Sequence, residues 1–190
     1  MKKTKLITLL ATIFCSVSGA YASTVYNYAG NSFTDRTGTL GDLYQEITIS
    51  LTFAEPLGPL HLYSQTPSGI SGGTLLDWQL SDGLFDFGPS FFGGSLDNCV
   101  LFTDASGNVA IWVIDALAIG SDGSLAHDVS NNYLDQAGLF SPTSQESSAS
   151  VQNSPGTWTE RTLVPEPSYF ALVLVALAAG SVWRRKRARE

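Results

Sequence analysis

The stretch Glu46-Ile47-Thr48-Ile49-Ser50-Leu51-Thr52-Phe53 alternates strictly between polar and apolar side chains. Successive side chains of a β-strand point to opposite faces, so this period of two predicts a strand over residues 46–53 with one buried and one solvated face. Its isoleucines and threonines are β-branched residues, which favour strands. One buried face and one wet face are typical of antiparallel sheets.

Similar short runs of β-branched and aromatic residues predict further strands over residues 24–28, 74–81, 99–103, 109–117 and 158–163. Turn-forming residues separate several of them, namely Asp82-Gly83, Ser106-Gly107-Asn108 and Asp122-Gly123. No stretch of this region has the apolar period of a helix. We therefore expect one all-β domain over residues 23–163, an antiparallel β-sandwich of jelly-roll-like arrangement. The polar residues 141–157 are predicted as a long loop or linker before the last strand.

The charge distribution excludes nucleic acid as a partner. Hydrophobic residues make up 44% of the chain and charged residues only 14%, so the chain has enough apolar side chains for a packed core. The basic residues gather at the two ends. Between residues 23 and 164, fifteen acids stand against Arg36 and Arg161, which gives a net charge of −13. Such a surface repels nucleic acids and anionic membranes.

The first 22 residues have the three parts of a secretory signal peptide. Lysines at positions 2, 3 and 5 precede an apolar run over residues 6–17. Ala20 and Ala22 then supply the small residues that signal peptidase binds, which predicts cleavage before Ser23. We expect the domain that follows to cross the cytoplasmic membrane.

The last part of the chain combines an apolar segment with a basic cluster. Residues 169–183 are uninterrupted by charge, and Arg184, Arg185, Lys186 and Arg187 follow directly. A helix over 169–183 reaches about 22 Å, and residues 164–168 or snorkelling side chains bring it close to the ~30 Å of a bilayer core. The sequence predicts a transmembrane helix over 169–183, with the basic tail 184–190 as a stop-transfer signal in the cytoplasm.

A short proline-containing motif precedes this apolar segment. The order Val164-Pro165-Glu166-Pro167-Ser168, apolar run and basic cluster resembles the PEP-CTERM sorting signal of Gram-negative bacteria that make exopolysaccharide. The resemblance covers residues 164–190 and implies that exosortase, a membrane-embedded cysteine transpeptidase, recognises Pro165, Glu166 and Pro167 and removes the tail. The two prolines would hold an extended stretch just outside the bilayer. The alternative is an ordinary C-terminal anchor with a proline-rich stalk.

The central region also resembles the ectodomains that many PEP-CTERM proteins share. The residues that carry this likeness are Trp78-Gln79-Leu80-Ser81-Asp82-Gly83, Phe102-Thr103-Asp104-Ala105-Ser106-Gly107-Asn108 with Trp112 after it, and Pro155-Gly156-Thr157-Trp158. Because strand–turn–strand patterns of this kind are generic hairpins, the likeness bears on the fold. It implies no assigned activity.

Few residues of the exported region offer catalytic chemistry. Its histidines are His61 and His127, and its single cysteine is Cys99. His127-Asp128 is the only suggestive pair for a hydrolase, and adjacent residues rarely orient each other as a catalytic triad requires. Cys99 lies in an apolar run and is expected to be buried, with no second cysteine for a disulfide. We predict no catalytic residues, no zinc site, no cofactor and no enzymatic activity.

Calcium is the one metal for which the sequence offers candidate ligands. Aspartates lie at predicted turns, and Asp82, Asp86 and Asp104 are the candidate ligands among them; the full set is Asp82, Asp86, Asp97, Asp104, Asp122 and Asp128. Carboxylates in loops are the oxygen ligands that calcium takes. The favoured interpretation is instead that these side chains cap turns by binding their own backbone. The aromatic residues Trp78, Phe85, Phe87, Phe91 and Phe92 are open to two roles, a sugar-stacking platform or, as we favour, core packing.

These features predict a secreted protein of the cell envelope or exopolysaccharide matrix with a structural or binding role. Its expected partners are signal peptidase, exosortase, the cytoplasmic membrane before processing, and exopolysaccharide. One alternative is a glycan-binding or glycan-modifying protein, and an acidic pair facing a cleft would favour the modifying enzyme. Another alternative is a membrane-anchored envelope protein that is not processed.

Overall fold

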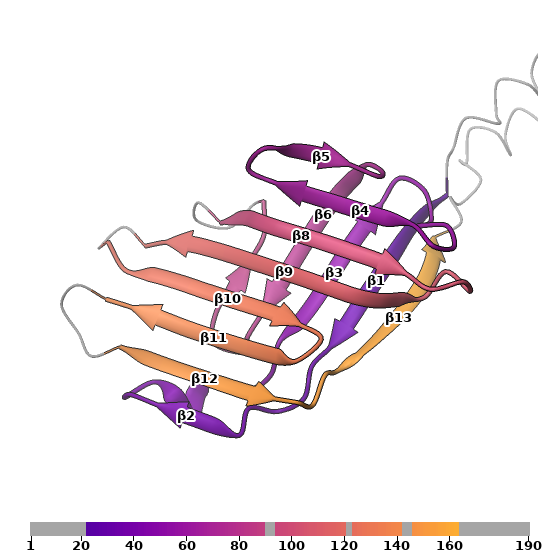
Figure 1. Ribbon diagram of the computed structural model, residues 1–190. Helices are drawn as coiled ribbons and strands as arrows, with labels where there is room; N and C mark the ends of the chain where they lie inside the picture. Colours follow the sequence, from indigo (N-terminus) through magenta and orange to yellow (C-terminus); the bar gives the residue numbers. More distant parts are fainter. Residues whose placement is uncertain (1–21, 90–93, 121–122, 142–145, 164–190) are drawn as a thin grey trace, which may run out of the picture. The chain divides into compact units, whose positions relative to one another are not determined.

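A computed structural model describes residues 22–89, 94–120, 123–141 and 146–163 (Figure 1). The predicted signal peptide, the Pro165-Glu166-Pro167 motif, the transmembrane segment 169–183 and the basic tail lie outside these ranges, so they stay predictions. One compact unit spans Ser23–Thr162. Among the described residues, no helix has the length and apolar character needed to cross a membrane.

The smaller sheet has five strands in the order β13-β1-β3-β6-β7, and the registers between β1, β3, β6 and β7 are antiparallel. The alternating stretch of the sequence forms its middle strand, β3, and places Ile49, Leu51 and Phe53 in the core. The strands are β1 (Ser23–Ala29), β3 (Thr48–Phe53), β6 (Leu75–Ser81), β7 (Asp86–Phe87) and β13 (Thr157–Leu163).

The larger sheet has eight antiparallel strands in the order β2-β12-β11-β10-β9-β8-β4-β5. The long strands β8 and β9 form its centre, and the chain between β2 and β3 includes one 3-10 turn, η1 (Gly41–Leu43). The strands are β2 (Asp35–Thr37), β4 (Leu62–Thr66), β5 (Gly69–Ser71), β8 (Ser95–Thr103), β9 (Val109–Ile119), β10 (Leu125–Asn131), β11 (Leu134–Phe140) and β12 (Ser147–Gln152).

The two sheets pack face to face, and their strands cross steeply in Figure 1. Most of the long strands turn alternate residues inward, so one hydrophobic core fills the space between the sheets. Aromatic rings bridge the layers: Phe53 of β3 contacts Tyr63 of β4 with ring centroids 4.8 Å apart. Because residues 23–163 contain both sheets and all of the described core, this segment has the elements of an independent folding unit.

The structure confirms the all-β prediction of two antiparallel sheets in a sandwich. It also corrects the prediction of a linker over 141–157, because residues Ser147–Gln152 form β12 inside the larger sheet. Ser147, Ala149 and Val151 are buried there. These buried side chains are small or isolated among serines, so the hydrophobic alternation that reveals a strand is weak in this stretch. Strands β10 and β11 were also not predicted from the sequence.

Candidate functional site

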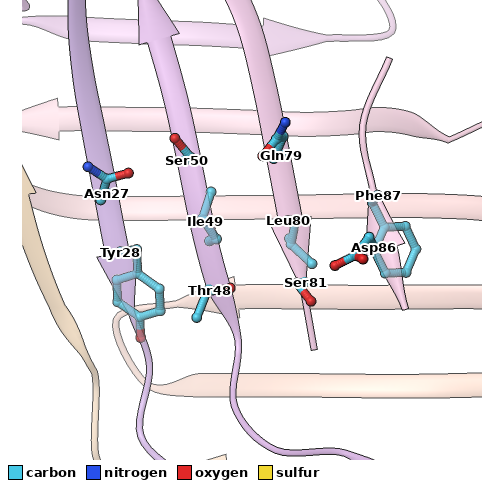
Figure 2. Close-up of a pocket in the computed structure, with 10 residues that line it drawn as sticks. All are labelled: Asn27, Tyr28, Thr48, Ile49, Ser50, Gln79, Leu80, Ser81, Asp86 and Phe87. Atoms are coloured by element: carbon cyan, nitrogen blue, oxygen red, sulfur yellow. The ribbon is translucent and has the colours of Figure 1, made fainter. Parts of the chain in front are cut away.

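A groove with a volume of about 470 Å³ lies on the outer face of the five-stranded sheet (Figure 2). This volume falls within the ~300–1,000 Å³ of small-molecule sites. Strands β1, β3, β6 and β7 lie side by side beneath it. Its lining residues are Asn27, Tyr28, Thr48, Ile49, Ser50, Gln79, Leu80, Ser81, Asp86 and Phe87.

The strand register sets the outward-facing polar side chains of the groove in two rows. Asn27, Ser50 and Gln79 are direct cross-strand partners and form the first row. Thr48, Ser81 and Asp86 are aligned in the same way and form the second. Directly opposed residues stand about 4.5–5.5 Å apart between Cβ atoms, so each row presents a line of polar groups at regular spacing.

Residues between the polar positions anchor the groove to the core. Tyr28, Ile49, Leu80 and Phe87 alternate with the polar residues and are 1–3% exposed. Their burial fixes the register, because a shift by one residue would turn the polar side chains of the groove into the core. The groove therefore lies on a rigid sheet rather than on a loop.

The chemistry of the groove is that of uncharged hydrogen bonding with one carboxylate. The side chains of Asn27, Ser50 and Gln79 make no hydrogen bond within the described part of the chain. Their amides and hydroxyls both donate and accept, which matches the hydroxyl groups of a sugar. Among the lining residues, only Asp86 is charged. Glycoside hydrolysis in its usual form needs a pair of carboxyl groups on either side of the bond.

An acidic pair does occur in the molecule, but it lies in the core. Asp82, after β6, and Asp128, in β10, are both fully buried and come from opposite sheets. Burial raises the pKa of Asp128 well above its usual value, and the negative charge of Asp82 and a hydrogen-bonding interaction with it raise it further. Burial also raises the pKa of Asp82. The pair is therefore suited to share a proton between the sheets, and it faces no cleft.

Four side-chain oxygens at this buried pair have no hydrogen bond of ordinary geometry. They are Oδ2 of Asp82, both carboxyl oxygens of Asp128 and the hydroxyl oxygen of Tyr44. Oδ1 of Asp82 accepts from the backbone N–H groups of Leu84 and Phe85, at 2.7 Å and 2.6 Å. Asp82 thus caps the turn into β7, as the sequence interpretation favours, while its other oxygen faces the core.

A third buried acid, Asp135, belongs to a satisfied hydrogen-bond network between the sheets. Oδ2 of Asp135 accepts a hydrogen bond of 2.8 Å from the Tyr28 hydroxyl, and Oδ1 accepts one of 2.7 Å from Ser130. The Trp112 indole N–H donates to Ser130 at 3.0 Å, and the backbone N–H of Gly156 donates to Tyr28 at 2.8 Å. Burial raises the pKa of Asp135 despite these bonds. This network ties β1 to β11.

Gly156 is required where the network meets the backbone. A Cβ at this position would lie 1.9 Å from the carbonyl oxygen of Ala29, which no side chain can tolerate. The chain after β12 can therefore approach β1 closely enough for the Gly156 N–H to reach Tyr28.

The structure separates the neighbours His127 and Asp128. Strand β10 turns Asp128 into the core and His127 outward, where Nε2 of His127 lies 2.6 Å from Oδ1 of Asp115 on β9. The alternation of side chains along a strand is the physical reason. The other histidine, His61, contacts the backbone carbonyl of Gly72 in the loop after β5.

The calcium candidates are not brought together. Asp82 is buried, Asp86 projects into the groove, and Asp104 caps the turn between β8 and β9. Oδ1 of Asp104 accepts from the backbone N–H groups of Ser106 and Asn108, and the bond from the Asn108 side chain is the main cause that lowers the pKa of Asp104. Within the described ranges, no group of three or more His, Cys, Asp and Glu side chains could hold a metal ion.

Three of the six aspartates lie elsewhere than the sequence predicted. Asp86, Asp97 and Asp128 are inside strands β7, β8 and β10 rather than in turns. Strand β7 has only two residues, and β8 and β10 carry polar residues among the apolar ones, so none of the three shows a clear alternation in the sequence. Asp122 lies outside the described residues.

The predicted burial of Cys99 and of the aromatic residues is largely confirmed. Cys99 is a fully buried free thiol, and burial raises its pKa to about 12. Trp78 and Phe87 belong to the core, and Phe85 packs against it. Phe91 and Phe92 lie outside the described residues. The alternative that Trp78 and Phe87 form a sugar-stacking platform is therefore wrong, because their rings face the core.

The groove was not predicted from the sequence. The alternating pattern of the sequence indicates that its polar residues face solvent, but the pattern does not indicate which strands become neighbours. Only the register of β1, β3 and β6 brings Asn27, Ser50 and Gln79 into one row. No protein-family model, curated protein or solved structure matches this chain.

Proposed function

We propose that this protein is an exported cell-envelope or exopolysaccharide-matrix protein that exosortase sorts and processes, and that its β-sandwich is a polysaccharide-binding module. In this proposal the signal peptide directs export and Pro165, Glu166 and Pro167 are the sorting motif. The segment 169–183 holds the chain in the cytoplasmic membrane as a transmembrane helix until it is removed.

The single observation that carries the binding role is the aligned polar row Asn27, Ser50 and Gln79 on the outer face of the five-stranded sheet. A polysaccharide is an extended chain that carries many hydroxyl groups. This row offers donors and acceptors across neighbouring strands, and no side chain of the described ranges competes for them. The groove is partly open, so it suits a segment of a long polymer.

The charge of the domain narrows the class of polysaccharide. The net charge of −13 over residues 23–164 repels acidic polymers. Only Asp86 is charged among the groove residues. The preferred ligand is therefore a neutral polysaccharide.

Binding is favoured over glycan hydrolysis. A hydrolase needs two carboxyl groups at the scissile bond, whereas the groove offers the carboxylate of Asp86 alone among its described lining residues. The acids with raised pKa values, Asp82, Asp128 and Asp135, are 0–2% exposed and lie between the sheets. A substrate cannot reach them.

Affinity electrophoresis tests this function. Residues 23–163 are run through native gels that contain neutral exopolysaccharide of the host, beside the variants Asn27→Ala and Gln79→Ala. Loss of one or two hydrogen bonds costs about 1.4 kcal/mol, which corresponds to about tenfold weaker binding. The matched control is Gln152→Ala, which removes an exposed amide from β12 of the other sheet. Equal retardation of all four proteins would refute the groove as the binding site.

A further inference from the structure

The buried acidic pair, Asp82 and Asp128, is joined through the chain to one end of the groove. Asp82 directly follows Ser81, and the turn after it leads into β7, which contributes Asp86 and Phe87 to the groove lining. Ser81 is also the cross-strand partner of Asp86, so residues on both sides of this turn line the groove (Figure 2). The position of the turn therefore sets where the lining residues of β7 stand.

Hydrogen bonds tie this turn, residues 82–85, to Asp82. Its Oδ1 accepts from the backbone N–H groups of Leu84 and Phe85 at 2.7 Å and 2.6 Å. The backbone N–H of Asp82 donates to the carbonyl oxygen of Phe85 at 3.2 Å, and its carbonyl oxygen accepts from the N–H of Gln45 at 2.9 Å. A displacement of the Asp82 carboxyl group would therefore disturb the whole turn.

Asp128 is the better anchored member of the pair. It lies inside β10, where its neighbours on the adjacent strands are Ala116 of β9 and Ala137 of β11. Strand β7, in contrast, has two residues and lies at the edge of the smaller sheet. Short edge elements with few backbone hydrogen bonds open at a lower free energy than central strands. Repulsion between the two carboxyl groups therefore moves the turn and β7 before it moves β10.

A shared proton prevents this repulsion. Burial raises the pKa of Asp128 well above its usual value, and the charge of Asp82 and a hydrogen-bonding interaction with it raise that pKa further. The hydroxyl of Tyr44 is the third titratable group at the pair, and its pKa is raised by burial and then by the charges of both aspartates. The strand neighbours Ala116 and Ala137 carry no charge. Loss of the proton therefore leaves two negative charges facing each other in the core.

We propose that the Asp82–Asp128 pair is a pH-sensitive latch that holds β7 in place at the end of the groove. While the pair keeps its proton, the turn stays docked and Asp86 and Phe87 complete the groove lining. When the proton leaves, the turn and β7 detach and the groove loses this end. The consequence for binding rests on the proposed function: neutral polysaccharide is held while the latch is closed and released as rising pH opens it. The latch itself does not depend on that function.

Hydrogen exchange of residues 23–163, followed for single amides by NMR from pH 5 to 9, tests the latch. Protection factors remove the intrinsic acceleration of exchange with pH. Opening releases a proton, so the protection factors of the Leu84 and Phe85 amides should fall by up to about tenfold per pH unit until the closed pair itself titrates. These amides should also exchange faster than those of β10, because the turn opens without the rest of the domain.

Two variants make the test specific to the pair. In Asp128→Asn the side-chain amide donates to Asp82 and has no proton to lose in this range, so both protection factors should stay nearly constant with pH. Asp35→Asn, at an exposed position of β2, is the matched control and should behave as wild type. Protection factors in wild type that do not change with pH, or that fall equally in Asp128→Asn, would overturn the latch. Exchange of the turn only together with β10 would overturn it as well.

Affinity electrophoresis in neutral exopolysaccharide of the host, at pH 6 and pH 9, tests the consequence for binding. Wild type should be retarded less at pH 9 than at pH 6, whereas Asp128→Asn should be retarded equally at both. Equal retardation of wild type at both values, with protection factors that fall, would show that opening does not reach the groove and would overturn the regulation of binding. No retardation at either pH would refute the proposed function, while hydrogen exchange, which needs no ligand, still decides the latch.

Discussion

The buried pair Asp82 and Asp128 makes the pH dependence of stability unusual. The pKa of Asp128 is raised well above its usual value in the folded protein. An unfolded aspartate titrates near 3.9, so above that pH the folded state holds a proton that the unfolded state has released. The free energy of unfolding must then fall as pH rises, until the folded Asp128 titrates as well.

The magnitude follows from linkage. Each proton of this kind lowers the free energy of unfolding by about 1.4 kcal/mol per pH unit. Asp82 and Asp135, whose pKa values are also raised by burial, act in the same direction. Asp128→Asn removes one titrating group and keeps the shape of the side chain. Its amide can also donate to Oδ2 of Asp82, which has no other partner.

We expect Asp128→Asn to gain stability relative to wild type with rising pH, by up to about 1.4 kcal/mol per unit. Urea denaturation of residues 23–163, followed by tryptophan fluorescence at a series of pH values from 4 to 8, measures this difference. Asp35→Asn, at an exposed position of β2, is the control and should shift the curve without changing its slope. Parallel curves for Asp128→Asn and wild type would refute a proton held by this pair.

Three further predictions concern the network between the sheets, the surface charge and the sorting motif. Tyr28→Phe keeps the ring but removes the hydrogen-bond partner of Asp135 and of the Gly156 N–H, so it should lower the free energy of unfolding in urea by about 1.5–3 kcal/mol. Tyr133 is 74% exposed, so the control Tyr133→Phe should leave the free energy of unfolding unchanged. Sodium chloride added from low ionic strength should raise the melting temperature, because it screens the repulsion within a domain of net charge −13. Millimolar calcium at constant ionic strength should not raise the melting temperature further, and a further rise that a chelator reverses would be evidence for a calcium site. Glu166→Ala should leave the tail attached and the protein in the membrane fraction, whereas normal release with the wild-type mass would contradict exosortase processing.

The sequence alone predicted the strands whose alternation is strong. The stretch that becomes β3 combines branched apolar residues with threonine and serine in strict order, so its buried face was evident. Strands β10 and β12 were missed because their buried positions include Ser130, Ser147 and Asp128, which look solvent-exposed in a sequence. Ser130 and Ser147 are tolerated there because they form hydrogen bonds, Ser130 with Asp135 and Ser147 with the backbone N–H of Leu40, whereas burial favours the protonated form of Asp128 by raising its pKa.

The groove could not be predicted without the strand topology. It is made from outward-facing residues, and its character depends on which strands become neighbours. Asn27 and Ser50 lie in strands that β2 separates in the sequence, and they become neighbours only because β1 pairs with β3. Local patterns predict which side chains point outward, while non-local pairing decides which of them form one surface.

The most direct test of the central claim is retention of the exported protein by the matrix of its native host. Wild type and the double variant Asn27→Ala with Gln79→Ala are expressed at equal levels, and the washed matrix and the medium are assayed for protein of verified mass. The account predicts that both proteins are exported and processed to the same mass, that wild type stays with the matrix, and that the double variant appears in the medium. Equal retention of the two proteins would contradict polysaccharide binding by the groove.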